Sequence, residues 1–253
     1  MKGVNVGNPT VPHVGDGIIT SAYPGFYLDH IIGKNVTHSG VPIVYIDGTT
    51  ITINISDLFI GRKWFRIDID YLCTIDVCIL PSFEKIHFSE TPLRSMHIEN
   101  AGGASEISEA LSMQYMENVF NATGFVPEKE VDYWIEYKMC DYIMRVNDQN
   151  IGVSVTRAVT YPFDNEFTYE HAVRLLDKKL YGLIVAQESV NIKHQFFKSI
   201  LHIWCYSAMS AQNIKKAHAE LKLKDTSLTY DNIYVICSIC HDKYIYTNHL
   251  RGN

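Results

Sequence analysis

Short apolar runs with alternating polar positions fill the first hundred residues and predict β-strands. The stretch VPIVYI is followed by Asp47 and Gly48 and then by the alternating run TITINI, a pattern that predicts a hairpin. The stretch KWFRIDIDYLCTIDVCIL predicts one or two further strands of the same kind. We therefore expect residues 1–98 to form a β-rich N-terminal region.

The pattern changes to a helical one near residue 101. In NAGGASEISEALSMQYMENVFNATG, Ser105 is the expected N-cap, and Glu106 and Glu109 fall in the first turn, where the helix dipole favours acidic side chains. Gly124 is the expected stop signal, because glycine readily adopts the left-handed conformation that ends many helices. The sequence therefore predicts a helix that begins at residue 105 and ends before residue 124.

Three β-type runs follow, VDYWIEYK, DYIMRV and IGVSVTRAV, with short polar breaks between them. An apolar stripe at helical spacing then marks TYEHAVRLLDKKLYGLIVAQ. After it come a buried strand in FFKSILHIWCYS, a basic amphipathic helix in SAQNIKKAHAELKLK and a last strand in NIYVICSI. Because a strand reached through a helix can lie parallel to its predecessor, we expect residues 99–253 to form an α/β domain with a mixed central sheet flanked by helices.

The composition is that of a globular protein. The chain has 253 residues, of which 47% are hydrophobic and 20% charged, so it can bury a substantial core. No apolar run approaches the roughly 20 residues that span a bilayer, and the first residues lack a signal-peptide pattern. The six cysteines are scattered, which favours reduced thiols over a disulfide framework. We expect an intracellular protein of the nucleus or cytoplasm with no membrane partner.

Basic residues are concentrated between Arg174 and Lys224. This segment holds nine basic and three acidic residues, a local charge of +6 in a chain whose net charge is −6. Such a segment is either a surface that faces a polyanion or a solvated helix face. In the first case DNA or RNA is the expected partner, and the candidate nucleic-acid-binding residues are Lys178, Lys179, Lys193, Lys198, Lys215 and Lys216.

An acidic residue opens the second of the three strand-like runs. If DYIMRV and IGVSVTRAV pair as a hairpin across residues 147–150, Asp141 lies beside the start of the latter run. Alternation then puts Ser154 and Thr156 on a small polar face, while valines and isoleucine on the other face pack against a helix. We expect the polar face to open into a cleft beside Asp141. The alternative is that Asp141 satisfies a backbone donor in a turn.

A metal ion is the chemistry that this arrangement suggests. A carboxylate next to hydroxyl groups can hold a hard divalent cation through oxygen ligands. Glu109 or Glu106, from the preceding helix, is the expected second acid beside Asp141. We therefore expect magnesium or manganese as the cofactor.

The order of elements from about residue 101 to residue 205 resembles the core of the restriction-endonuclease-like superfamily, the PD-(D/E)XK nucleases. KMCDYIMRV is similar to the second strand of that family, with Asp141 at the position of the motif aspartate. In the family the third strand supplies an acid and, two residues later, a lysine. This chain has Ser154 and Thr156 there, so the third-strand motif is degenerate.

The resemblance implies a phosphodiesterase in which carboxylates hold magnesium and a lysine assists the attack of hydroxide. Candidates for the missing acid are Glu109 and Glu106, as above. Candidates for the missing cation are Lys138, Lys178, Lys179 and Arg157, although Arg157 falls on the apolar face of its strand and an arginine is a poor base. We count Lys138 with Asp141, Ser154 and Thr156 as the expected catalytic set.

Two further groups of residues have alternative interpretations. Cys237, Cys240, His241 and His249 could supply zinc ligands, but no second pair has a usual zinc-finger spacing, so buried thiols are expected and zinc is not. Aromatic residues beside Lys193 and Lys198 could stack on the bases of a single strand or fill the core; they are Phe196, Phe197, Trp204 and Tyr206.

Three functions follow from these observations. The first is a nucleic-acid-binding or nucleic-acid-processing protein that acts as a magnesium-dependent phosphodiesterase. The second is a catalytically inactive module of the nuclease fold that serves in nucleic-acid or protein binding and assembly. The third is a protein-interaction domain, for which the net negative charge is the argument.

Overall fold

The computed structural model describes most of the chain from residue 43 to residue 247. The described residues are 43–46, 49–52, 54–59, 62–69, 73–80, 83–96, 105–161, 166–224 and 232–247. By their contacts the residues form two compact units, Met1–Asn54 and Ile55–Asn253. Within the first unit, β1 (Ile43–Ile46) and β2 (Thr49–Thr52) pair in antiparallel fashion, which confirms the predicted hairpin.

The second unit is built on one mixed sheet. Among the described residues its strand order is β3-β4-β5-β10-β9-β8-β7-β6. The strands are β3 (Asn54–Phe59), β4 (Arg62–Ile69), β5 (Cys73–Ile79), β6 (Thr123–Pro127), β7 (Tyr142–Val146), β8 (Gln149–Ala158), β9 (Lys198–Cys205) and β10 (Ile233–Ile239). The four central strands, β5, β10, β9 and β8, run parallel to one another. Next to them, β4 pairs with β5, β7 with β8 and β6 with β7 in antiparallel fashion.

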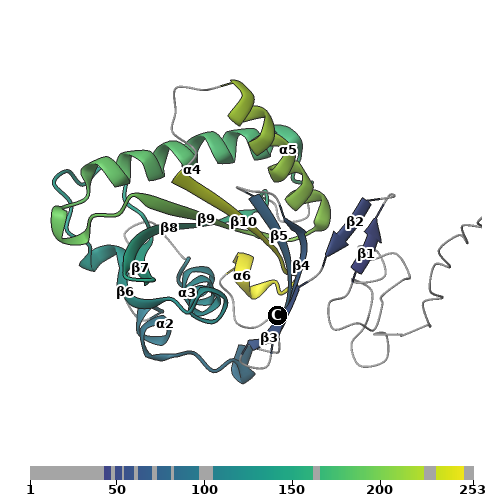
Figure 1. Ribbon diagram of the computed structural model, residues 1–253, viewed down its shortest axis with the longest axis horizontal. Helices are drawn as coiled ribbons and strands as arrows, with labels where there is room; N and C mark the ends of the chain where they lie inside the picture. Colours follow the sequence, from purple (N-terminus) through teal and green to yellow (C-terminus); the bar gives the residue numbers. More distant parts are fainter. Residues whose placement is uncertain are drawn as a thin grey trace, which may run out of the picture. The chain divides into compact units, whose positions relative to one another are not determined.

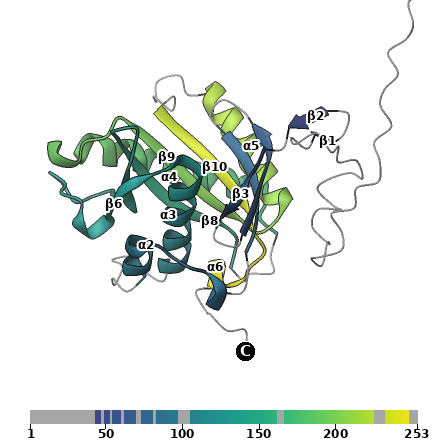
Figure 2. The same cartoon turned by 60° about the horizontal axis from the view of Figure 1, so that its bottom comes forward.

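Helices cover both faces of this sheet (Figure 1). One face carries α4 (Tyr169–Ser189) and α5 (Ala208–Lys224), and the other carries α3 (Glu106–Phe120) with the short helices α2 (Glu90–Ser95) and α6 (Tyr244–Thr247). Three 3₁₀ turns complete the described elements: η1 (Phe83–Lys85), η2 (Glu128–Glu130) and η3 (Ile192–His194). The predicted α/β class with a mixed sheet flanked by helices is confirmed. Figure 2, the same ribbon turned, shows α3 lying along its face of the sheet.

The strands β3 to β5 belong to the same sheet as the second half of the chain. We expected a boundary between a β-rich region and an α/β domain at residues 98 and 99. In the structure β5 pairs in parallel with β10, with Cys237 opposite Ile75. A chain segment from before residue 98 and one from after residue 232 are therefore neighbours in one sheet.

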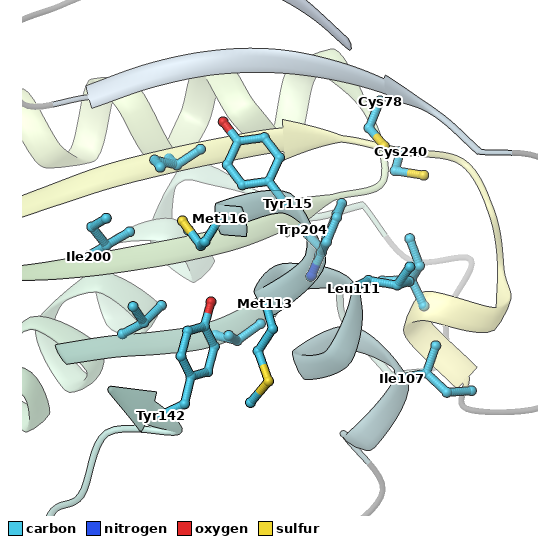
Figure 3. Close-up of a cluster of buried hydrophobic side chains, with 14 of the residues drawn as sticks. Cys78, Ile107, Leu111, Met113, Tyr115, Met116, Tyr142, Ile200, Trp204 and Cys240 are labelled. Atoms are coloured by element: carbon cyan, nitrogen blue, oxygen red, sulfur yellow. The ribbon is translucent and has the colours of Figure 1, made fainter. Parts of the chain in front are cut away.

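The helix α3 is enclosed along most of its length. Every residue from Ile107 to Met116 is buried, because the sheet lies on one side and α2 and α6 contact the helix as well. Leu111 and Tyr115 pack against Tyr142 and Trp204 of the sheet in the cluster drawn in Figure 3. The helix ends at Phe120, and Asn121 adopts the left-handed conformation with φ 50°. Asn121 thus stops the helix, where we had expected Gly124 to do so.

The helix α4 follows its predicted stripe. Ala172, Leu176, Leu180 and Leu183 are buried toward the sheet. Its first turn is closed by a capping box, because the Thr168 N–H donates to Nδ1 of His171 while the Thr168 hydroxyl accepts from the His171 N–H. The capping box fixes where the helix begins, and the buried stripe shows which side of α4 faces the sheet.

The hairpin of β7 and β8 is confirmed, and its turn has a defined geometry. Val146 pairs with Gln149, and the two residues between them, Asn147 and Asp148, have φ 48° and 61°. Positive φ at both central positions is the mark of a type I′ turn, whose twist matches that of the flanking strands. The turn fixes the register in which Tyr142 lies opposite Val153.

Two predictions about this half of the sheet are wrong. The run VDYWIEYK contributes no strand to the sheet and makes a single bridge between Tyr133 and Val190. The strand before β7 is β6, which pairs with it through Pro127 and Tyr142. The small polar face of β8 is also not an open cleft, because α4 covers it and Ser154 is only 5% exposed.

A chain of buried hydrogen bonds links α3 to the sheet. The hydroxyl of Ser112 lies 2.7 Å from the Tyr142 hydroxyl and 2.7 Å from Nδ1 of His202. The other ring nitrogen of His202 lies 2.9 Å from the Ser238 hydroxyl. Burial lowers the pKa of His202 to about 3, so this imidazole is neutral at physiological pH. His202 is thus a core residue, as is Trp204, which donates its indole N–H to the Ser108 carbonyl.

All six cysteines are free and buried, which confirms the expectation of reduced thiols. Cys240 lies beside Cys78 on the face of the sheet that α3 covers (Figure 3). By strand alternation Cys237 points to the opposite face, where a hydrogen bond with the Cys205 side chain, together with burial, raises the pKa of its thiol. Because Cys237 and Cys240 point to opposite faces, they do not converge on one ion; His249 lies outside the described residues.

Candidate functional site

The site is built on Asp141, the residue directly before β7. Its carboxylate oxygen Oδ2 accepts a hydrogen bond from the Ser154 hydroxyl at 2.8 Å and one from the Val155 N–H at 2.5 Å. The Asp141 main chain is held on both sides, since its N–H donates to the Val153 carbonyl and its carbonyl accepts from the Glu128 N–H, each at 2.9 Å. The expected contact between Asp141 and Ser154 is therefore present.

A lysine of α4 reaches the same place. The Lys179 ammonium donates to the Ser154 hydroxyl at 3.3 Å and to the Val155 carbonyl at 3.2 Å. Lys179 was one of four candidates for the cation that the third strand lacks, and it is the one whose ammonium bonds to Ser154. A single hydroxyl thus separates a cationic group from the carboxylate of Asp141.

Glu128 is a second carboxylate close to Asp141. It is the first residue of η2, directly after β6, and it is partly buried. Burial raises the pKa of Glu128, the negative charge of Asp141 raises it further, and the positive charge of Lys179 lowers it. Two carboxylates that repel each other in a partly buried place are a suitable environment for a cation.

Little in the sequence pointed to Glu128 as a site residue. Its place beside Asp141 depends on the pairing of Pro127 with Tyr142, and the strand containing Pro127 was assigned wrongly. The run TGFVP is only five residues long and contains a glycine and a proline, both of which are depleted in strands, so its propensity signal is weak. Only the acidic character of the short segment EKE marked the position.

Glu106 and Glu109 lie on the other side of the sheet. Val153 and Val155 pack into the α3 cluster, so alternation places Ser154 toward α4 and Arg157 toward α3. Burial lowers the pKa of Arg157, while the charges of Glu109 and Glu106 raise it. Both glutamates are thus associated with Arg157 on the α3 face, whereas Asp141 bonds to Ser154 on the α4 face.

The remaining predicted residues are spread over several elements. Thr156 lies two residues beyond Ser154 on the same face of β8 and is partly buried. The ammonium of Lys138 lies 5.0 Å from the centroid of the Tyr137 ring. Lys193 forms an ion pair with Asp132 at 3.2 Å.

The other predicted nucleic-acid-binding lysines lie on α4, α5 and β9. Lys178 is exposed on α4, Lys198 is exposed at the start of β9, and Lys215 and Lys216 lie on α5. The ammonium of Lys216 lies 4.9 Å from the centroid of the Tyr169 ring. Because α4 and α5 cover the same face of the sheet, Lys178, Lys215 and Lys216 come from one layer of the fold.

The donor set suits magnesium better than zinc. The described part of the chain contains no group of three or more His, Cys, Asp and Glu side chains that could enclose a metal ion. Magnesium commonly keeps several water molecules and uses only one or two protein carboxylates together with substrate phosphates. Asp141 and Glu128 supply two such carboxylates, and Oδ1 of Asp141 is not the oxygen that accepts from Ser154 and Val155. These residues therefore fit the ion that the resemblance implies.

None of the described helices is long and apolar enough to cross a membrane. No family model matches the sequence, and no solved structure matches it. A curated protein from Dictyostelium discoideum, described as AAC-rich mRNA clone AAC4 protein, is 35% identical over 147 residues, which cover 55% of this chain and 21% of that protein. The chain thus spans about a fifth of the length of this relative. That description states no activity, so the function of this chain has to be inferred from its own residues.

Proposed function

We propose that this protein binds nucleic acid and hydrolyses its phosphodiester bonds with the help of a divalent cation, in the manner of the PD-(D/E)XK nucleases. The observation that carries the proposal is the chain of contacts from Lys179 through Ser154 to Asp141. An acid at the start of one strand, a hydroxyl on the next strand and a cation from the covering helix meet at one point. The order α3-β6-β7-β8-α4-β9, with α3 and α4 on opposite faces, supports the same comparison.

The carboxylates of Asp141 and Glu128 would hold the ion. A magnesium ion bound there would supply Lewis-acid stabilisation of a phosphoryl oxygen and a more acidic water molecule. Its positive charge would also relieve the repulsion between the two carboxylates that raises the pKa of Glu128. Ser154 and the Val155 N–H hold one oxygen of Asp141 in place, which fixes the direction of the other.

The role of Lys179 is electrostatic. Its ammonium is positioned by the Ser154 hydroxyl and the Val155 carbonyl, so it adds a fixed positive charge beside the carboxylates. Charge of this kind stabilises the negative charge that develops on phosphate oxygens in the transition state. The exposed Lys178 on the same helix would attract the nucleic-acid backbone without contacting the reacting atoms.

One observation favours a catalytically inactive module as the second candidate. Oδ2 of Asp141 already accepts two hydrogen bonds, and Ser154 occupies the position at which the family has an acid. An aspartate satisfied in this way can serve to tie β7 to β8 without binding a metal. In that case the fold would bind nucleic acid or protein without cleaving phosphodiesters.

Metal-dependent stability separates the two candidates. We expect millimolar magnesium or manganese to raise the melting temperature of the wild type, because an ion at 100 times its Kd stabilises a protein by about 2.7 kcal/mol. Asp141→Asn and Glu128→Gln should each abolish that increase. Asp177→Asn is the matched control, since Asp177 is exposed on α4 and lies outside the site.

Cleavage is tested with the same four proteins. Single-stranded and duplex DNA and RNA are incubated with each protein and manganese, and products are followed on denaturing gels. Cleavage by wild type and Asp177→Asn, but not by Asp141→Asn, is the expected result. Equal metal stabilisation of wild type and Asp141→Asn, together with no cleavage, would overturn the proposal and favour the inactive module.

A further inference from the structure

A second feature of the fold is a pocket of about 430 Å³ at the C-terminal end of α4. Its volume lies within the range of small-ligand sites in proteins. The lining residues come from three segments: Trp134 from the loop after η2; Gln187, Glu188 and Val190 from the end of α4; and Ile192, Gln195, Phe196 and Phe197 from the turn before β9.

The pocket combines flat aromatic walls with amide groups. Trp134 is 69% exposed and Phe197 is 66% exposed, so both rings are largely open to solvent. No hydrogen bond within the described part of the chain engages the side-chain amides of Gln187 and Gln195. Phe196 is buried, and its ring lies against Gly152 of β8. Aromatic faces together with free amides are the chemistry that recognises a flat, polar heteroaromatic ring such as a nucleobase.

The exposed aromatic side chains around the pocket form one surface. Half of the exposed large hydrophobic side chains in the described part of the chain come from just two short segments; they are Trp134, Ile135, Tyr137, Ile192 and Phe197. The two segments lie side by side, because the Trp134 N–H donates to the Ser189 carbonyl at 2.8 Å and the Asn191 N–H donates to the Asp132 carbonyl at 2.9 Å. Exposed apolar patches of this kind mark binding surfaces.

The loop that carries part of this surface also connects the two carboxylates of the candidate active site. The loop that carries Trp134 and Tyr137 begins after Glu128 and ends at Asp141, the two carboxylates of the site. The loop is fixed at its end, since the Tyr133 hydroxyl accepts from the Cys140 N–H at 3.0 Å. The pocket residue Trp134 and the two carboxylates thus belong to one short stretch of the chain.

We propose that the pocket between Trp134 and Phe197 binds an unstacked base of a single-stranded nucleic acid. This inference rests on the proposed function and narrows its substrate class to single strands, of DNA or of RNA. A base in a duplex is already stacked on both sides, whereas a base in a single strand is free to stack on an aromatic ring. The Glu188 carboxylate can accept a hydrogen bond from a ring N–H or an amino group of a base, and either glutamine can pair with a base edge.

Lysines near the pocket would bind the phosphates of the single strand. Lys198 directly follows Phe197 and is exposed at the first position of β9. Lys138 directly follows Tyr137, and its ammonium lies over the Tyr137 ring. Lys193 is less available for this purpose, because it forms an ion pair with Asp132.

The test measures binding without cleavage. Fluorescence anisotropy with the full chain in EDTA compares labelled oligothymidylate, oligouridylate, a duplex of the same length and an abasic single strand. The two single strands that carry bases should bind, and the comparison between them identifies DNA or RNA as the preferred source. The abasic strand has the same backbone charge and no bases, so it should bind roughly tenfold more weakly or worse.

Variants locate the contact. Trp134→Ala and Phe197→Ala should each weaken single-strand binding roughly tenfold, the usual cost of losing one stacked base, and Trp134→Phe should keep most of the affinity. Tyr161→Ala is the matched control, because Tyr161 is 97% exposed and follows the opposite end of β8 from the one that pairs with Lys198. Since all three side chains are largely exposed, the melting temperatures of the four variants should stay within a few degrees of the wild type.

Three results would overturn the inference. They are equal binding of abasic and normal strands, unchanged affinity in Trp134→Ala, and a dimeric wild type that becomes monomeric in Trp134→Ala, which would make a second copy of the chain the occupant. The proposed function is judged separately. Cleavage of duplexes that Trp134→Ala leaves unaffected would refute the pocket alone, and metal-independent binding through Trp134 without any cleavage would refute the phosphodiesterase alone.

Discussion

Lys179 and Ser154 are joined by a hydrogen bond of 3.3 Å between the ammonium of α4 and a hydroxyl of β8. The same hydroxyl donates to Asp141 at 2.8 Å. Helix and strand are thus tied together at the point where the candidate site needs a positive charge. Four predictions follow from this contact and from three others in the fold, each of which can be measured on single variants.

Lys179→Met should both destabilise the protein and remove phosphodiester cleavage. The loss of two hydrogen bonds from a charged group predicts a decrease of about 1–3 kcal/mol in the free energy of unfolding. Lys178→Met is the control, because Lys178 is exposed and such surface changes usually stay within about 0.5 kcal/mol. Urea denaturation and the manganese-dependent cleavage assay give the two quantities. Equal losses in both variants would contradict the assignment of Lys179 to the site.

Glu128→Gln should make the metal-free protein slightly more stable at pH 7. Burial and the charge of Asp141 raise the pKa of Glu128, so the folded state binds this proton more tightly than the unfolded state does. The stabilising contribution of Glu128 is therefore present below its unfolded pKa and is lost as the pH rises through its folded pKa.

Glu128→Gln removes the charged carboxylate, so at neutral pH the variant regains the stability that the wild type loses when Glu128 ionises. The gain should be below about 1 kcal/mol, because Glu128 is partly exposed and solvent screens its charge. Thermal melts in EDTA at pH 7 and near pH 4 measure it, and the advantage over the wild type should shrink at the lower pH. A variant less stable than the wild type at pH 7 would show that the carboxylate is not under electrostatic strain.

His202 should make stability fall in mild acid. Its folded pKa is lowered by burial to about 3, whereas an unfolded histidine titrates near 6.5. The contribution of His202 is thus complete above pH 6.5 and is lost as the pH falls toward 3, at about 1.4 kcal/mol per pH unit.

Urea midpoints between pH 7 and pH 4 test this slope. His202→Gln should be less stable at pH 7, because Ser112 and Ser238 lose a well-placed partner, but its stability should depend less on pH. Some slope should remain, since burial also lowers the pKa of His241 to about 4. An unchanged slope in His202→Gln would mean that its ring is already protonated or accessible in the folded state.

Two glycines should respond in opposite ways to alanine. A Cβ at Gly152 would lie 2.4 Å from the Phe196 ring, so this buried ring would have to move. We expect Gly152→Ala to cost about 1–3 kcal/mol, as overpacking usually does. A Cβ at Gly182 in α4 would meet nothing within 4 Å, and Gly182→Ala should add about 0.5–1 kcal/mol of stability. Chemical denaturation of both variants provides the comparison, and a destabilised Gly182→Ala would contradict the open space beside that residue.

The elements that the sequence predicted correctly were those in which apolar residues recur at regular spacing. The buried positions of α4 recur at helical spacing, and the alternation in β8 placed Ser154 and Val155 on opposite faces, as the structure does. The turn at Asn147 and Asp148 identified the hairpin, and the hairpin brought Asp141 to Ser154. In these places local pattern and tertiary packing favour the same structure.

The errors arose where packing overrides the local pattern. Residues 131–138 are rich in aromatic and β-branched side chains, as strands are. In the structure Trp134 and Tyr137 are exposed, and the segment lies beside the last residues of α4, with one bridge from Tyr133 to Val190, instead of joining the sheet. Strand β6, with its glycine and proline, forms because β7 offers it a partner edge. Lys179, and not Lys138, contacts Ser154 because of the way α4 is rotated against β8. This rotation depends on tertiary packing and cannot be predicted from the local sequence around either lysine.

The position of β10 has a consequence for biosynthesis. This strand is the last to leave the ribosome among the eight of the sheet, yet it lies between β5 and β9. Until Ile233–Ile239 has emerged, the strands β3 to β5 and the strands β6 to β9 cannot pair into one sheet, because β10 is the strand that joins them. The nascent chain must therefore keep two open sheet edges apart until β10 has emerged, and cooperative folding of this sheet waits for that strand.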